Sequence, residues 1–151
     1  MAAAASTRLG CPVSFELSIV NVDKPELSEA EVARRVAQFH GADSIWITRA
    51  ATFREKAELF PNAAFVLGFD TASRLIDPRY YANDVGQRDD ALRTLTQCGC
   101  RIVVGGRTDA SGTFRVWSGE VLPDEFRELF LILEESDFRV DVSSTQLREF
   151  G

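Results

Sequence analysis

Histidine is almost missing from this 151-residue chain, and this shortage limits the chemistry that the chain can perform. The sequence has one histidine, His40, so a mechanism or a metal site that needs two histidines from this chain is excluded. Three cysteines, Cys11, Cys98 and Cys100, are an odd number without the spacing of a disulfide framework. They also lack the partner ligands of a zinc site. We interpret them as free thiols of a reducing compartment.

Long apolar runs and an excess of positive charge are missing as well. No apolar run approaches the roughly 20 residues that cross a bilayer, so we expect no membrane partner. The formal net charge of −6 offers no basic surface for DNA or RNA, so we expect no nucleic-acid partner. We expect a cytoplasmic protein. An organelle is the alternative, because the Ala-rich start lacks acidic residues, as transit peptides do.

The remaining sequence has the composition of one globular domain. Apolar residues make up 45% of it and charged residues 26%, which are ordinary values for a folded protein. Residues 1–13 are Ala-rich, and we expect them to form a disordered tail. Residues 14–151 contain no low-complexity linker and no repeat, so we expect a single domain there.

Strand and helix patterns alternate along residues 14–151. Apolar or alternating runs predict strands at 14–20, 44–48, 63–69, 100–106 and within 129–136, with an edge strand or hairpin at 113–117. Amphipathic or capped stretches predict helices at 28–40, 52–60, after 70, at 87–99, a short turn of helix at 123–129 and a closing helix at 143–150. This alternation predicts a three-layer α/β/α sandwich around a mostly parallel sheet.

One candidate anion site lies near the end of the chain. Ser143, Ser144 and Thr145 begin the closing helix, whose first N–H groups are suited to binding a phosphate. Arg148 follows within about one turn and can bind phosphate through two N–H groups. The plainer interpretation is a capped terminal helix with a solvated arginine.

Two further candidates follow predicted buried strands. Gly68 allows close approach of a ligand to the backbone, and the carboxylate of Asp70 can bind ribose hydroxyls. Gly106 and Arg107 follow the next buried strand and can approach a nucleotide and its phosphates. Ligands of open parallel sheets bind beyond the carboxyl ends of the strands, so we expect these segments to meet. The plainer interpretation is a helix-capping aspartate and a flexible turn, since neither a P-loop nor a dinucleotide-binding motif is present.

Several motifs together resemble a known superfamily. The segment VSSTQLR (142–148) is similar to the ISSTxxR motif of nucleotidylyltransferases. The segment TFREKAELFPNAAFVLGFDTASRL (52–75) resembles the block of nicotinate and nicotinamide mononucleotide adenylyltransferases in which a strand leads into Gly-x-Asp. The segments FELSIVNVDKP, GCRIVVGGR and FRVDVSSTQLRE resemble a plant and algal branch of the superfamily. The resemblance covers roughly residues 14–150.

The resemblance implies a Rossmann-like nucleotidylyltransferase fold and an adenylyl transfer. In that reaction the phosphate of a mononucleotide, such as nicotinamide mononucleotide, attacks the α-phosphate of ATP, and pyrophosphate leaves with Mg²⁺. The protein acts mainly by positioning and by stabilising charge. By position, the residues that would hold the ATP phosphates are Ser143, Ser144, Thr145 and Arg148. Those that would face the acceptor are Thr52, Gly68 and Asp70, and those near the nucleotide are Gly106 and Arg107.

The sequence departs from the superfamily at its most characteristic motif. A GxFxPxHxGH segment, whose histidines bind ATP phosphates, should precede residue 14, but this chain has one histidine and 13 residues there. Loss of one preorganised transition-state donor typically costs about 100- to 1000-fold in rate. We therefore expect no adenylyl transfer by this chain alone, and a fold without the first strand and helix. A partner chain can fill a missing strand position by β-addition.

Three alternatives remain open from the sequence. The chain can be part of an enzyme whose N-terminal segment is supplied from elsewhere. It can be a non-catalytic module that binds a nucleotide or serves as a structural subunit of an assembly. It can also be an unrelated α/β protein in which the motifs occur by coincidence.

Overall fold

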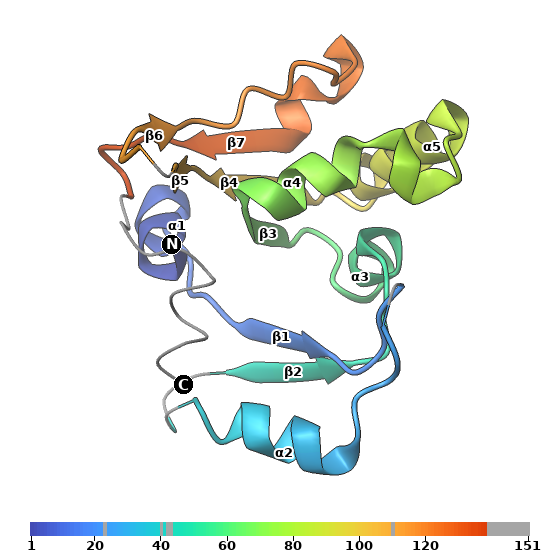
Figure 1. Ribbon diagram of the computed structural model, residues 1–151, viewed down its shortest axis with the longest axis vertical. Coiled ribbons are helices and arrows are strands. Elements are labelled where there is room, and N and C mark those ends of the chain that lie inside the picture. Colours follow the sequence, from blue (N-terminus) through green and yellow to red (C-terminus); the bar gives the residue numbers. More distant parts are fainter. Residues whose placement is uncertain (23, 40, 42–43, 110, 139–151) are drawn as a thin grey trace.

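The computed structural model describes residues 1–22, 24–39, 41, 44–109 and 111–138, and it has a mixed α/β fold (Figure 1). The helices are α1 (Ala2–Leu9), α2 (Glu29–Val36), α3 (Phe53–Leu59), α4 (Phe69–Ile76) and α5 (Val85–Gln97), with 3₁₀ turns η1 (Pro78–Tyr81) and η2 (Asp124–Leu129). The strands are β1 (Phe15–Ser18), β2 (Ile45–Thr48), β3 (Ala64–Gly68), β4 (Arg101–Gly105), β5 (Arg107–Thr108), β6 (Phe114–Arg115) and β7 (Phe130–Leu133).

Most of the core lies around a parallel sheet with the strand order β3-β4-β7. The central strand is β4, in which Ile102, Val103 and Val104 are completely buried. Ile102 and Val104 belong to a large apolar cluster that includes residues of α4 and α5, whereas Val103 belongs to a smaller cluster with Ala5 of α1. Apolar contacts therefore cover both faces of this sheet, which agrees with the apolar runs in its strands.

A second parallel sheet consists of β1 and β2. On one of its faces, the ring of Phe15 packs against Phe39, just after α2, at 4.8 Å between ring centroids. Glu16 of β1 accepts hydrogen bonds from the hydroxyl of Thr48 and from the ammonium group of Lys56 in α3. The amphipathic helix and the two strands expected for this region are confirmed.

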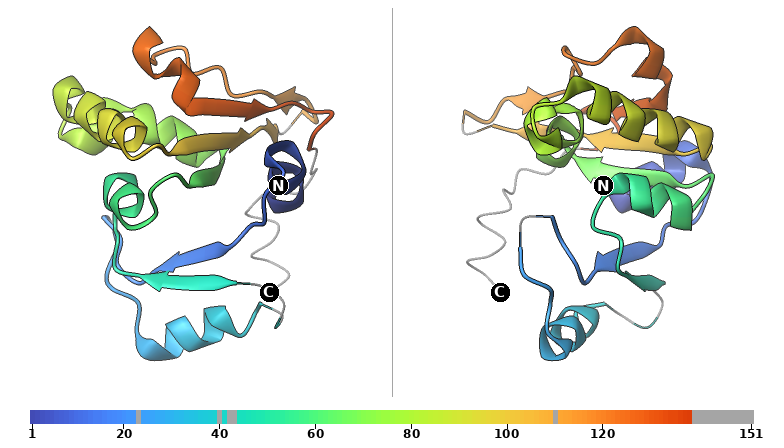
Figure 2. Two further views of the ribbon diagram at one scale, coloured as in Figure 1. Left: turned by 180° about the vertical axis from the view of Figure 1, so that it is seen from behind. Right: turned by 90° about the vertical axis from the view of Figure 1, so that its right-hand side faces the viewer.

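The two parallel sheets are not joined by strand pairing among the described residues. The strands of the two sheets run in opposite directions. In Figure 1 the arrows of β1 and β2 point away from α1, whereas the arrow of β7 points toward the side where α1 lies. The views in Figure 2 show the same separation between the β1–β2 pair and the β3-β4-β7 sheet. The expectation of α/β architecture with mostly parallel strands is confirmed.

The first residues differ from the disordered tail that the sequence predicts. Ala2–Leu9 form helix α1, which ends at Gly10 in the left-handed conformation with φ 66°. Ala5 is completely buried and packs with Val103 and Leu133 of the β3-β4-β7 sheet. Alanine favours helix because it loses no side-chain entropy. Its small side chain also allows α1 to lie close to the sheet, so the prediction of a disordered tail is wrong for this segment.

Local sequence signals explain most element boundaries. The Ser28 side chain accepts a hydrogen bond from the backbone N–H of Glu31 and begins α2. Thr52 begins α3 with a complete capping box. Gly99 follows α5 with φ 68°, a conformation that glycine adopts without a steric penalty. The predicted hairpin is confirmed as the antiparallel pair β5–β6.

Candidate functional site

The carboxyl ends of β3 and β4 bring two predicted site segments together. Gly68 and Gly105 lie opposite each other in the register of the two strands. Arg107 then donates a hydrogen bond to the carboxylate of Asp70, with 2.8 Å between Nη1 and Oδ1. The guanidinium carbon of Arg107 also lies 5.4 Å from the centroid of the Phe69 ring. The expectation that these two segments meet is confirmed.

The Asp70–Arg107 pair is open to solvent. The side chains of Asp70 and Arg107 are 65% and 53% exposed, so the pair contributes little to stability. Asp70 is in the first turn of α4, whose N-cap is Gly68 and has no side-chain capping bond. The plainer interpretation of Asp70 as the residue that caps this helix is therefore wrong. Its carboxylate is directed to Arg107, and a polar ligand can reach both groups.

The two glycines of this region differ in their surroundings. A Cβ atom at Gly106 would lie 2.4 Å from the ring of Phe114 and 2.7 Å from the backbone oxygen of Arg115. Gly106 is buried beneath strand β6, so close packing of the hairpin explains the need for glycine there. A Cβ atom at Gly68 would meet nothing within 4 Å, so the backbone at this position is accessible. Ligand contacts of both glycines remain predictions.

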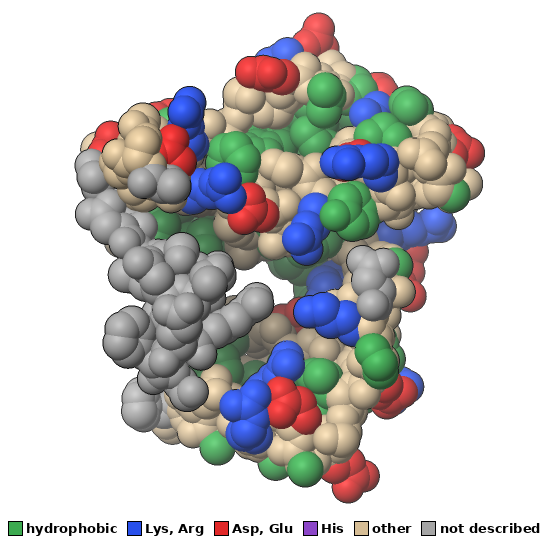
Figure 3. Space-filling model, viewed as in Figure 1, with side chains coloured by type: hydrophobic (Ala, Val, Ile, Leu, Met, Phe, Trp, Pro, Cys, Tyr) green, Lys and Arg blue, Asp and Glu red, His purple; other side chains and the backbone are tan. Residues whose placement is uncertain are grey.

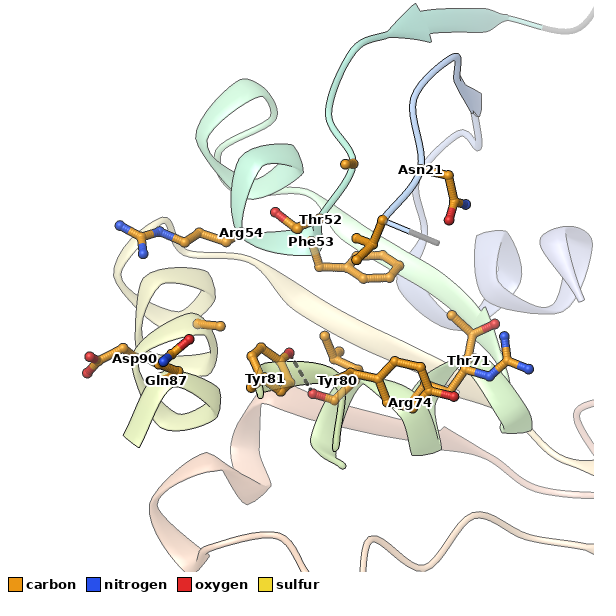
Figure 4. A pocket seen from close by; sticks show the side chains of 14 residues that line it. Asn21, Thr52, Phe53, Arg54, Thr71, Arg74, Tyr80, Tyr81, Gln87 and Asp90 are labelled. Carbon is orange, nitrogen blue, oxygen red and sulfur yellow. Dashed lines mark hydrogen bonds between the residues drawn. The ribbon is translucent and has the colours of Figure 1, made fainter. Parts of the chain in front are cut away.

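A cavity of about 370 Å³ lies next to this region, between α3, α4, η1 and α5 (Figure 4). Its size is within the range of small-molecule sites. Segments that follow β1 and β2 contribute to its wall together with α4, and the lining does not include Gly68, Asp70, Gly106 or Arg107. The lining residues are Asn21, Val22, Ala51, Thr52, Phe53, Arg54, Thr71, Arg74, Leu75, Tyr80, Tyr81, Gln87, Asp90 and Ala91.

The charged groups of this cavity favour an anion. The carboxylate of Asp90 binds Arg93 at 2.6 Å, so it is already paired. Arg54 lies 3.7 Å from Glu58. The guanidinium group of Arg74 has no ion pair or hydrogen bond with the described residues. An exposed arginine without a carboxylate partner can bind a phosphate or carboxylate through two N–H groups.

Aromatic side chains form the apolar part of the cavity. Figure 4 shows the rings of Phe53, Tyr80 and Tyr81 around its centre. The hydroxyl of Tyr81 donates a hydrogen bond to the backbone oxygen of Leu75 at 2.8 Å, and this bond fixes the ring. Burial raises the pKa of Tyr81 above its usual value, so this residue is a neutral hydrogen-bond donor at neutral pH. Tyr80 is 47% exposed and can contact a ligand.

Thr52 lines the cavity and also begins α3. Its backbone N–H and hydroxyl donate hydrogen bonds to the carboxylate of Glu55 at 2.7 and 2.9 Å. Its hydroxyl oxygen also accepts a hydrogen bond from the N–H of Glu55 at 3.3 Å. These bonds explain Thr52 as a helix cap, and its place in the wall agrees with the predicted position near a substrate. A ligand contact of Thr52 stays a prediction.

The remaining predicted phosphate-binding residues lie outside the described part of the chain. They are Ser143, Ser144, Thr145 and Arg148. The sequence interpretation also missed Arg74 and Tyr80. The adjacent aromatic residues Tyr80 and Tyr81 are a sequence signal that could have indicated a ligand wall. Arg74 gives no comparable signal, because its place in the cavity depends on how α4 packs.

Comparison with known proteins finds no match: no family model, no curated protein and no solved structure is significantly similar to this chain.

Among the described residues, no group of three or more histidine, cysteine, aspartate or glutamate side chains is arranged to hold a metal ion. None of the helices in this part of the chain has the length and apolar character needed to cross a membrane.

Proposed function

We propose that this chain is a nucleotidylyltransferase-like domain that binds a mononucleotide and does not transfer AMP by itself. The observation that carries the proposal is the cavity that contains Thr52, an aromatic wall and Arg74, whose guanidinium group has no partner among the described residues. A mononucleotide needs a cationic group for its phosphate and an apolar surface for its base, and the wall of this cavity provides both. The proposal favours the cytoplasm as the location and keeps an organelle as the alternative.

The residues have separate roles in this proposal. Arg74 binds the phosphate of the mononucleotide, and Phe53 and Tyr80 contact its base. Thr52 and the backbone at Gly68 face the same ligand. Asp70 binds ribose hydroxyls after Arg107 turns from the carboxylate to a phosphate, because the exposed pair costs little to separate.

ATP is the second nucleotide of the proposal. Ser143, Ser144, Thr145 and Arg148 hold its phosphates, as the resemblance of 142–148 implies, and Gly106 and Arg107 lie near it. Mg²⁺ accompanies ATP only if transfer occurs. With a single histidine the chain lacks the motif that stabilises the transferred phosphate. Binding without transfer is therefore the expected behaviour of the chain alone.

Isothermal titration with nicotinamide mononucleotide, AMP and ribose 5-phosphate tests the proposed site. We expect the two nucleotides to bind more tightly than ribose 5-phosphate, because the sugar phosphate lacks a ring. The variant Arg74→Gln should weaken binding of both nucleotides at least tenfold, the equivalent of about 1.4 kcal/mol. Arg101→Gln removes an exposed arginine outside the cavity and provides a control matched in charge.

Two results would contradict the proposal. Equal loss of affinity in the Arg74→Gln and Arg101→Gln variants would mean that only the net charge matters. Release of pyrophosphate from ATP, Mg²⁺ and nicotinamide mononucleotide at a rate typical of enzymes, above about 1 s⁻¹, would show that the chain is a complete transferase. A coupled phosphate assay measures this rate.

A second candidate function is that of a structural subunit in a larger assembly. The edges of β1 and β3, with which no described strand pairs, favour this function, since such edges accept strands from other chains. The titration discriminates the two functions, because a purely structural subunit should bind none of the three ligands.

A further inference from the structure

Strand β3 is at the edge of its sheet but has the surroundings of an internal strand. Its sequence, AFVLG, contains no charged residue and no proline. Phe65 and Leu67 contact the large apolar cluster on one face, whereas Ala64 and Val66 contact the smaller cluster with α1 on the other. Natural edge strands normally carry charges, proline or a bulge that prevent pairing. None of these features protects the edge of β3.

The hydrogen-bonding groups on this open edge can be identified. The backbone N–H of Arg101 in β4 binds the backbone oxygen of Ala63 at 2.9 Å. Because alternate residues of a strand direct their N–H and C=O groups to the same side, Phe65 and Leu67 also face β4. The corresponding groups of Ala64 and Val66 point to the open edge. No other strand among the described residues pairs with this side of β3.

Strand β1 presents a second edge across from β3, and within the described part of the chain no strand pairs with it. The N–H groups of Phe15 and Ile19 donate to the backbone oxygens of Ser44, just before β2, and of Thr48, the last residue of β2. By the same alternation, the backbone groups of Glu16 and Ser18 point away from β2. Figure 1 shows β1 and β3 on opposite sides of one space, and Figure 3 shows an opening through the described surface at that place.

We propose that this space is a docking site for one extended apolar segment of a partner protein, which adds to the edge of β3 as a new strand. Main-chain hydrogen bonds to Ala64 and Val66 would hold the segment. Its side chains would alternate between two sides. The α1 side is apolar, and the α3 side holds Phe53 and Phe65 together with the ion pair of Lys56 and Glu16. The partner segment is therefore a strand of about five residues, apolar toward α1 and mainly apolar toward α3.

The arrangement of the two sheets favours an extended segment, and not a second folded copy of the chain, as the occupant of this site. The β1–β2 pair and α2 lie opposite the edge of β3 (Figures 1 and 2). A second folded copy cannot bring its own β3 edge to this position without colliding with them. A single extended strand needs only the spacing of about 4.8 Å between neighbouring strands. The segment would run parallel to one of the two edges and antiparallel to the other.

A labelled peptide can test this proposal on the full chain. The probe is a fluorescein-labelled peptide with five alternating valine and isoleucine residues between two pairs of lysines, and fluorescence anisotropy measures its binding. We expect saturable binding to the unmodified chain. Val66→Pro removes an N–H group from the open edge only, and it should weaken binding at least tenfold. Val66→Ala keeps this group and should change the affinity less than threefold.

A second peptide separates main-chain pairing from apolar adsorption. It carries the same side chains with an N-methyl group on each of the five apolar residues, which removes the main-chain donors of both peptide edges, and we expect it to bind at least tenfold more weakly. Equal binding of both peptides, equal affinity of the Val66→Pro variant, or no binding at all would overturn the proposal. Slow hydrogen exchange of the Val66 amide without peptide would also overturn it, because the chain itself or a second copy would then occupy the edge.

Discussion

At the scale of single residues, the cavity depends on side chains that also build the fold. Thr52 caps α3, and Tyr81 binds the end of α4 through its hydroxyl. Arg74 differs, because no described residue pairs with its guanidinium group. A variant of Arg74 therefore tests ligand binding with little effect on folding, whereas a variant of Thr52 changes both.

Thr52→Ala should lower the free energy of unfolding by about 1 kcal/mol, the typical effect of losing an N-cap side chain. The reason is that the N–H of Glu55 loses its acceptor and the capping box opens. Thr52→Ser keeps the hydroxyl and serves as the control. Urea unfolding measures both variants. Equal stability of Thr52→Ala and the unmodified chain would mean that α3 does not depend on its cap.

At the scale of elements, α1 shows how composition alone can mislead. The Ala-rich start has no amphipathic pattern strong enough to indicate burial, so the sequence predicted disorder. The helix docks because Ala5 fits against Val103 and Leu133. Close packing of this kind depends on the shape of the sheet surface, which is created by residues about 100 positions later.

Ala5→Leu should lower the free energy of unfolding by about 1–3 kcal/mol, because a larger side chain overfills a packed contact. Ala3 is exposed on the same helix, so Ala3→Leu is a matched control and should change stability by less than about 0.5 kcal/mol. Differential scanning calorimetry compares the two variants. The same small effect in both would show that α1 does not pack on the sheet.

At the scale of the whole molecule, a chain of side-chain contacts connects the two parallel sheets through α3. Glu16 of β1 binds Lys56 of α3, and the ammonium group of Lys56 lies 5.9 Å from the Phe53 ring. Phe53 in turn packs against Phe65 of β3, with 5.8 Å between ring centroids. Helix α3 therefore couples the two sheets, although their strands do not pair.

Glu16→Gln should lower the free energy of unfolding by about 1–3 kcal/mol, because Lys56 is left largely buried without its carboxylate partner. The side chain of Lys56 is 11% exposed, so solvent does not replace the lost contact. The double variant Glu16→Gln, Lys56→Gln should recover part of the loss, since no unpaired charge remains. Urea unfolding of the unmodified chain, the single variants Glu16→Gln and Lys56→Gln, and the double variant forms a double-mutant cycle. A coupling energy near zero would mean that the pair does not connect β1 to α3.

Much of the fold and part of the candidate site could be predicted from local patterns. Apolar runs located the strands β3 and β4, and capping residues located α2 and α3 within a few residues. The rule for parallel strands also predicted that Asp70 and Arg107 would meet. Arg74 could not be identified in this way, because nothing near it in the sequence shows that its helix borders a cavity.

The sequence by itself determined most of the described helices and strands after residue 13, because periodicity, caps and apolar runs act over a few residues. It also determined that two histidines are not available for catalysis. Only the tertiary structure decided that the β1–β2 pair stays apart from the β3-β4-β7 sheet, that α1 covers one face, and that Arg74 has no partner among the described residues. These features depend on contacts between residues far apart in the chain, and no local pattern specifies them.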